Sequence, residues 1–141
     1  MKKFFANDKR LHIVEKGLSD NEGFVYFKPA SSGGTIVEDD DKDDEGIIRI
    51  PVISIDSVEL CRNATFIKMD IEGSEMKALE GAKQTILCNK PKLTICIYHS
   101  DEDMVRIAEY IHSLVPEYKL YIRHHTSEKN ETVLYAVIEK D

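Results

Sequence analysis

The second half of the chain has the clearest alternation between short apolar runs and longer amphipathic segments. Residues 65–69 and 93–98 are compact apolar runs without clean polar alternation, which is typical of strands buried on both faces. Between them, residues 74–87 repeat apolar side chains at helical spacing, and Asn89 and Pro91 mark the end of that helix. These three segments predict a parallel β-α-β unit with a right-handed crossover.

The C-terminal third predicts one more helix and a hairpin. Residues 104–115 repeat apolar side chains at helical spacing as far as Pro116, and residues 100–103 just before them have the sequence of a helix N-cap. Residues 118–123 and 132–138 have strand patterns separated by a polar loop. This arrangement predicts a terminal antiparallel hairpin.

The N-terminal third has a less regular pattern. Residues 11–14 and 23–28 predict two strands of an antiparallel hairpin, and residues 47–55 predict a further strand. Residues 56–59 have the spacing of an N-capping box. The acidic run at 38–46 is expected to be a mobile, solvated loop, because its like charges repel and its spacing does not match the ligand pattern of a calcium loop.

Length and composition limit the class of protein. A chain of 141 residues with 42% hydrophobic and 32% charged residues fits one domain, with an N-terminal part at 1–46 and a core at 47–141. No apolar run approaches the roughly 20 residues of a membrane span, and we expect no membrane partner. The first residues do not resemble a signal peptide, so we expect a cytoplasmic location. A net charge of −7 argues against a nucleic-acid partner.

Two sets of side chains are weak candidates for metal or disulfide chemistry. Cys61, Cys88 and Cys96 form no Cys-x-x-Cys pair, so we expect buried free thiols. His124 and His125 are adjacent on a predicted strand and therefore point to opposite faces. The spacings that define metal sites are absent, and the sequence predicts no metal.

Three carboxylates lie within six positions after the predicted strand at 65–69. Asp70, Glu72 and Glu75 surround the glycine turn that leads into the helix, where clustered carboxylates raise one another's proton affinity and can serve as a general base. Tyr98 and His99 occupy the carboxyl end of the next parallel strand and should open onto the same crevice, where His99 could serve as base or ligand. The alternative is that these residues have structural roles only. Glu75 would complement the helix dipole, and Asp70 would cap the helix. Glu72 would be solvated, and His99 would be a hydrogen-bonded side chain at the strand end.

Two residues nearby have structural explanations. Lys68 interrupts a buried strand, and we expect its side chain to snorkel to solvent or, in the favoured interpretation, to form a structural ion pair with a carboxylate such as Asp56 or Glu59. Gly81 lies inside the predicted helix, where it permits a close approach of the helix to the sheet.

The acidic turn and its surroundings resemble the FkbM family of S-adenosylmethionine-dependent methyltransferases. The most characteristic match is Ile67-Lys68-Met69-Asp70-Ile71-Glu72-Gly73-Ser74-Glu75 with residues 78–82. Residues 54–58, 90–93, 98–99, 121–125 and 131–136 also match segments of the family. The resemblance covers residues 47–138, and residues 11–28 more weakly.

The resemblance implies an α/β fold of the class I, Rossmann-like type, with a mostly parallel sheet, helices on its faces and a C-terminal antiparallel hairpin. It implies an O-methyltransferase that acts on a hydroxyl of a small metabolite or sugar. Asp70, Glu72, Glu75 and His99 would be catalytic, and Asp70, Ile71 and Glu72 would contact S-adenosylmethionine. A substrate oxygen would attack the methyl group in line while a carboxylate or imidazole takes the proton.

The sequence departs from the family pattern in its N-terminal part. It has no glycine-rich turn that opens a helix, because Gly33-Gly34 lies between two strand patterns. It also has no acidic residue at a strand end that would bind the ribose hydroxyls of the cofactor. We therefore expect the C-terminal part of the domain, without the main cofactor-binding loop.

Other functions stay open at this point. One is a non-catalytic binding or assembly module that needs a partner, and another is a metal-dependent hydrolase built on the acidic turn and His99. In the family fold, the strand at 65–69 would pair with the first strand, which the sequence lacks, so one edge of it is left open. We expect the N-terminal hairpin or a second copy of the chain, in a homodimer, to cover that edge.

Overall fold

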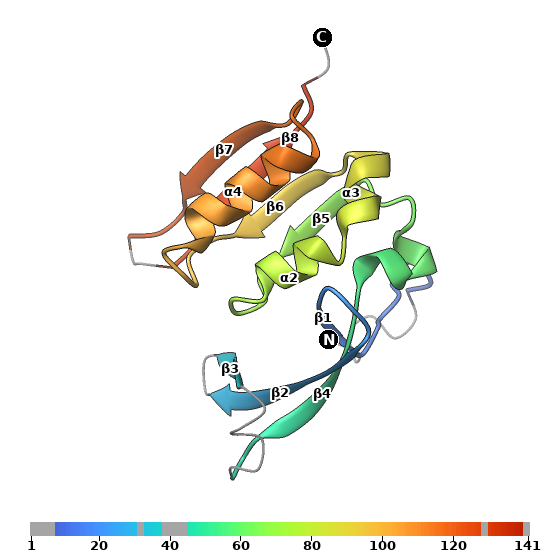
Figure 1. The fold of residues 1–141 in the computed structure, drawn as a ribbon, viewed down its shortest axis with the longest axis vertical. Helices are drawn as coiled ribbons and strands as arrows, with labels where there is room; N and C mark the ends of the chain where they lie inside the picture. The colour runs from blue at the N-terminus through green and yellow to red at the C-terminus, as the bar shows by residue number, and fades with distance from the viewer. Residues whose placement is uncertain (1–7, 31–32, 38–44, 128–129, 140–141) are drawn as a thin grey trace.

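The computed structural model describes residues 8–30, 33–37, 45–127 and 130–139. They form two four-stranded sheets and one layer of helices, which makes the fold α/β (Figure 1). Most of the acidic run that we expect to be a mobile loop, residues 38–44, lies outside the described residues.

The C-terminal sheet has the strand order β5-β6-β8-β7. Its strands are β5 (Phe66–Met69), β6 (Lys92–Cys96), β7 (Lys119–His124) and β8 (Thr132–Val137). The parallel pairing of β5 with β6 confirms the predicted β-α-β unit, and the antiparallel pairing of β7 with β8 confirms the terminal hairpin. Only the β5–β6 pair is parallel, because β8 enters the sheet antiparallel to both of its neighbours. The expectation of a mostly parallel sheet is therefore wrong, and the sheet is mixed.

The helices of the described chain cover one face of this sheet. They are α2 (Glu75–Glu80), α3 (Lys83–Asn89) and α4 (Asp103–Leu114). Helix α4 contacts β8, and α2 and α3 both contact α4, so the three form a single layer (Figure 1). Their inner side chains and those of the sheet form the core, whose fully buried members include Met69, Leu79, Ile86, Leu93, Ile95, Ile107, Ile111 and Leu134.

The segment predicted as one helix over 74–87 is two helices that break at Gly81. The backbone carbonyl of Gly81 accepts a hydrogen bond from the Asp56 amide at 2.8 Å. The Asp56 carboxylate accepts hydrogen bonds from the amides of Gln84 and Thr85 at the start of α3, both at 2.8 Å. A residue distant in sequence thus satisfies the amides that a helix beginning here would leave unpaired.

This role of Asp56 also corrects the predicted capping box. Residues 55–57 and 59–61 form short 3-10 turns, η2 (Ile55–Ser57) and η3 (Glu59–Cys61), and neither has a side-chain cap. The carboxylate that was expected to cap its own turn instead caps α3.

The N-terminal sheet has the order β1-β4-β2-β3. Its strands are β1 (Gly17–Leu18), β2 (Gly23–Ala30), β3 (Gly33–Val37) and β4 (Ile48–Ile53). Strand β2 pairs antiparallel with β3 and β4, and β1 pairs parallel with β4. The predicted strand at 11–14 is absent and its apolar side chains are exposed, so the predicted hairpin with 23–28 is wrong.

Candidate functional site

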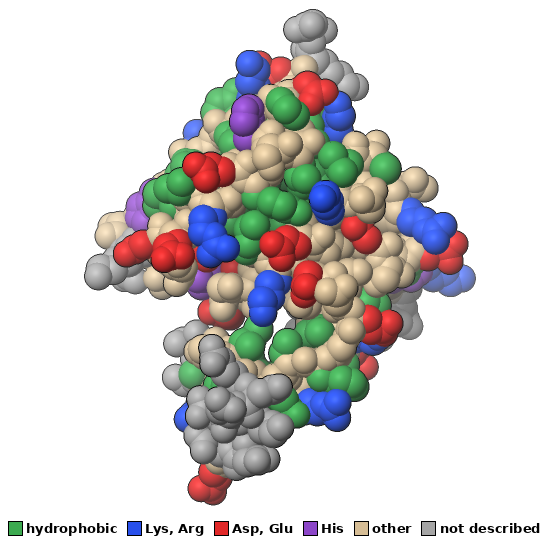
Figure 2. Space-filling model, viewed as in Figure 1, with side chains coloured by type: hydrophobic (Ala, Val, Ile, Leu, Met, Phe, Trp, Pro, Cys, Tyr) green, Lys and Arg blue, Asp and Glu red, His purple; other side chains and the backbone are tan. Residues whose placement is uncertain are grey.

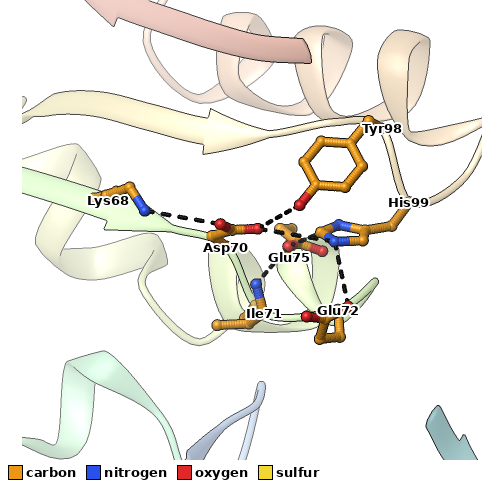
Figure 3. Close-up of polar contacts among 7 residues, drawn as sticks. All are labelled: Lys68, Asp70, Ile71, Glu72, Glu75, Tyr98 and His99. Carbon is orange, nitrogen blue, oxygen red and sulfur yellow. Dashed lines mark hydrogen bonds and ion pairs between the residues drawn. The ribbon is translucent and has the colours of Figure 1, made fainter. Parts of the chain in front are cut away.

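The acidic turn curls because two consecutive residues adopt left-handed backbone angles. Glu72 has φ +57° and Gly73 has φ +88°, a region that favours glycine. A Cβ at Gly73 would lie 3.7 Å from the His99 Cβ, so the turn passes close to the end of β6. The curl directs the Glu75 side chain back to the strand end, where its Oε1 accepts a hydrogen bond from the Ile71 amide at 2.8 Å (Figure 3).

The imidazole of His99 lies among the three predicted carboxylates. Its Nδ1 is 3.2 Å from Glu75 Oε1, and its Nε2 is 3.6 Å from Glu72 Oε2 and 3.8 Å from Asp70 Oδ1 (Figure 3). The parallel register, in which Met69 faces Ile95, brings both strand ends to the same edge of the sheet. All four residues that we predict to be catalytic are thus brought together, and their role stays a prediction.

Two neighbouring side chains hold Asp70 in place. The Tyr98 hydroxyl donates to Asp70 Oδ1 at 3.0 Å, and Lys68 Nζ lies 3.9 Å from Asp70 Oδ2. Burial, together with this hydrogen bond, raises the pKa of Tyr98 well above its ordinary value, so the phenol stays a proton donor. The sequence places Tyr98 at this crevice beside His99 but assigns it no catalytic or cofactor-binding role; its hydrogen bond to Asp70 is seen only in the structure.

The predicted ion pair of Lys68 is present, but the two partners suggested for it are wrong. Its side chain is exposed on β5, and its ion-pair partner is Asp70 rather than Asp56 or Glu59. Asp56 is engaged with the first turn of α3.

Several polar atoms of the cluster are buried without a hydrogen-bond partner. Glu75 has no exposed surface and its Oε2 has no partner, and the two ring nitrogens of His99 have none either. The 3.2 Å contact between Glu75 and His99 is close enough for an ion pair but does not have hydrogen-bond geometry. The arrangement can therefore accept a proton or bind a positively charged group.

Cavities formed by the described residues lie beside the cluster. A cavity of about 530 Å³ runs along the outer edge of β5, and Ile71, Leu18, Ile55 and Phe66 line part of it. Another, of about 430 Å³, borders Glu72 and the start of α2. Hydrophobic side chains flank the hollow between the two sheets (Figure 2). The predicted cofactor contacts Ile71 and Glu72 thus each face open space.

The remaining candidate side chains lie away from this site. His124 and His125 are exposed, at 2.8 Å from the Thr132 hydroxyl and 2.7 Å from the Tyr135 hydroxyl respectively. The cysteines are free thiols, but the expectation that they are buried holds only for Cys96, since Cys61 is half-buried and Cys88 is exposed. No helix in the described part of the chain has the length and apolar character needed to cross a membrane.

Comparison with known proteins places the chain in a protein family. A family model described as the methyltransferase FkbM domain matches residues 5–126. The chain belongs to the FkbM methyltransferase family. The crystal structure of methyltransferase FkbM from Methylobacillus flagellatus KT is 32% identical, with a TM-score of 0.73. The match covers 96% of this chain and 31% of that chain, so the present FkbM-family chain spans less than a third of the solved protein. No curated protein matches the sequence.

Proposed function

We propose that this FkbM-family chain provides the proton-accepting side of an S-adenosylmethionine-dependent O-methyltransferase, acting on a hydroxyl of a small metabolite or sugar. The observation that carries the proposal is the His99 ring, which lies 3.2 to 3.8 Å from three carboxylates at the shared end of β5 and β6. Ligands of open α/β sheets bind at such strand ends.

The charge of the cluster fits the reactive end of the methyl donor. S-adenosylmethionine, when bound, supplies a methyl group on a positively charged sulfonium. The Asp70 and Glu72 side chains are 32% and 47% exposed, so their carboxylates are accessible to a cation in the crevice. Ile71 contributes an apolar surface beside them.

The residues of the chain have separate tasks in this scheme. An acceptor hydroxyl donates its proton to the exposed Glu72 carboxylate as its oxygen becomes the nucleophile, and Glu72 Oε2, 3.6 Å from the buried His99 Nε2, relays the proton to that nitrogen. The Glu75 carboxylate at Nδ1 stabilises the imidazolium that forms. Tyr98 holds Asp70 beside the ring by its hydrogen bond.

Titration calorimetry with S-adenosylmethionine tests the proposal on the chain alone, with S-adenosylhomocysteine, which lacks the sulfonium charge, as the comparison. We expect S-adenosylmethionine to bind in the micromolar range, weakened at least about tenfold by Asp70→Asn and unchanged by Glu80→Gln, an exposed carboxylate of α2. Transfer of labelled methyl groups to hydroxyl compounds should be lost in His99→Gln while product binding persists. Absence of binding, or equal binding by Asp70→Asn, would refute this assignment.

A second candidate, an assembly module, is favoured by the edge of β5. Within the described ranges β5 pairs only with β6, and its other edge borders the cavity of about 530 Å³. The N-terminal sheet contributes Gly17 and Leu18 to this cavity, but β1 pairs with β4 and not with β5. A strand from another polypeptide or from a second copy, as in a homodimer, would extend the sheet there.

Sedimentation and hydrogen exchange test the assembly module. A dimer at micromolar concentration, with amides of β5 protected only in the dimer, would support it. A monomer at all concentrations with rapidly exchanging β5 amides would rule out self-assembly through this edge.

A further inference from the structure

We infer that Asp70, Glu75 and His99 form a binding site for a divalent transition-metal cation of the Mn²⁺ or Zn²⁺ type. Each residue offers one ligand atom, and the three atoms lie within 4.8 Å of one another. The sequence predicts no metal from ligand spacing, and a metal at the acidic turn and His99 enters there only through the alternative of a hydrolase.

The burial of Glu75 is the observation that points to a ligand. Its carboxylate has no exposed surface, and Oε2 has no hydrogen-bond partner. The other oxygen, Oε1, is occupied by the Ile71 amide, which fixes the carboxylate with Oε2 free. A buried carboxylate oxygen without a partner costs free energy, and such atoms are normally satisfied by a hydrogen-bond donor, a counter-charge or a metal.

The His99 ring supports the same conclusion. The His99 side chain is only 12% exposed, and both ring nitrogens lack hydrogen-bond partners. A protonated ring would supply one positive charge, but its geometry toward Glu75 leaves both the ring N–H groups and Oε2 unsatisfied. A cation bound among the three groups would satisfy the nitrogen and the free oxygen together.

The ligand types select the class of cation. Two carboxylates with one imidazole suit Mn²⁺, Fe²⁺ or Zn²⁺ better than Mg²⁺ or Ca²⁺, which prefer oxygen ligands alone. Tyr98 donates to Asp70 and would orient that ligand from the second coordination sphere. Glu72 lies on the exposed side, 3.6 Å from Nε2, so a coordination position faces the crevice.

This inference goes beyond the proposed methyl transfer and does not require it. With a cation bound, His99 is a ligand, and the exposed carboxylate of Glu72 becomes the group that can take a proton from an acceptor. Cation binding can be measured without cofactor or acceptor, so its failure and the failure of methyl transfer are distinguishable.

Mn²⁺ titration of the chelator-treated chain tests the site, with electron paramagnetic resonance to count bound ions and thermal unfolding to follow stability. We expect one tight ion per chain and a rise in the unfolding temperature with both Mn²⁺ and Zn²⁺. Glu75→Gln and His99→Gln should each weaken binding at least about tenfold. Glu80→Gln on the same helix, and a variant with Asp changed to Asn at 39–41, should retain it, which separates this site from the acidic run.

Four outcomes would overturn the inference. They are the absence of tight Mn²⁺ and Zn²⁺ binding, unchanged affinity in Glu75→Gln and His99→Gln, loss of binding in the 39–41 variant, and Mg²⁺ binding as tight as Mn²⁺ binding. Circular dichroism checks that each variant folds. If Glu75→Gln does not fold, Asp70→Asn at the more exposed ligand replaces it, with the same expected loss of affinity.

Discussion

Replacing Gly81 by alanine tests how the helix layer is joined to the N-terminal sheet. An added Cβ would lie 2.1 Å from the Ser19 carbonyl oxygen and 3.0 Å from the Ser54 Cβ, whereas real Cβ contacts below 3.0 Å are essentially never seen. Gly81 has φ −72°, an ordinary value, so the cost is steric and not conformational. The obstructing atom belongs to the backbone, and it must move by about 1 Å to restore contact distance.

The magnitude follows from two opposed effects. Overpacking of a dense site costs about 1–3 kcal/mol, and the upper half of that range applies because backbone must shift. The better helix propensity of alanine returns at most about 1 kcal/mol. We expect a net loss of about 2 kcal/mol, or roughly 6 °C in unfolding temperature for a chain of this size.

Urea unfolding followed by circular dichroism measures the change, and Gly23→Ala is the matched control. Nothing lies within 4 Å of a Cβ at Gly23, so its stability should change by less than about 1 kcal/mol. Equal stability of Gly81→Ala and the unmodified chain, or an equal loss in both variants, would refute the close approach between Gly81 and Ser19.

Three further predictions concern the core and the helix cap. Asp56→Ala should cost about 1–2 kcal/mol in urea unfolding, because two amides of α3 lose their acceptor; a change below about 0.5 kcal/mol would contradict this capping role. Burial raises the pKa of Tyr118 to about 12, so the neutral phenol is favoured in the folded state. That stability is present below pH 10 and is lost as pH rises toward 12, by about 3 kcal/mol in total, and the loss should be smaller in Tyr118→Phe. Exposed Cys88 should react at once with an aromatic disulfide reagent at pH 8, whereas Cys96, buried and with its pKa raised to about 12, should react only after unfolding; equal rates would contradict the burial.

Local patterns were sufficient to predict the parts of the fold whose partners are close in sequence. The β5-helix-β6 unit and the β7–β8 hairpin follow from apolar spacing and turn residues alone. The break at Gly81 does not, because its cause is Asp56, a residue from a separate segment whose carboxylate ends up at the first turn of α3. The failed strand at 11–14 has the same kind of cause, since strand formation depends on which neighbour is available.

The candidate site was also only partly predictable from the sequence. The meeting of Asp70, Glu72 and His99 was predictable, because parallel strands place their carboxyl ends at one edge. The burial of Glu75 was not, since the first turn of a helix is usually exposed and the sequence favoured a simple dipole interaction. The left-handed angles at Glu72 and Gly73 turn that side chain inward, and sequence spacing does not reveal them.

The charge balance of the cluster gives the two proposals a common physical basis. Three carboxylates surround one imidazole, and a further positive charge, Lys68, lies 3.9 Å from Asp70 on an exposed side chain. Even with His99 protonated, the site carries excess negative charge and one buried oxygen without a partner. A bound cation would balance that charge, as both proposals require. The two proposed sites share Asp70, whereas buried Glu75 belongs to the metal site alone. Glu75→Gln should therefore weaken metal binding far more than binding of S-adenosylmethionine, and Asp70→Asn should weaken both.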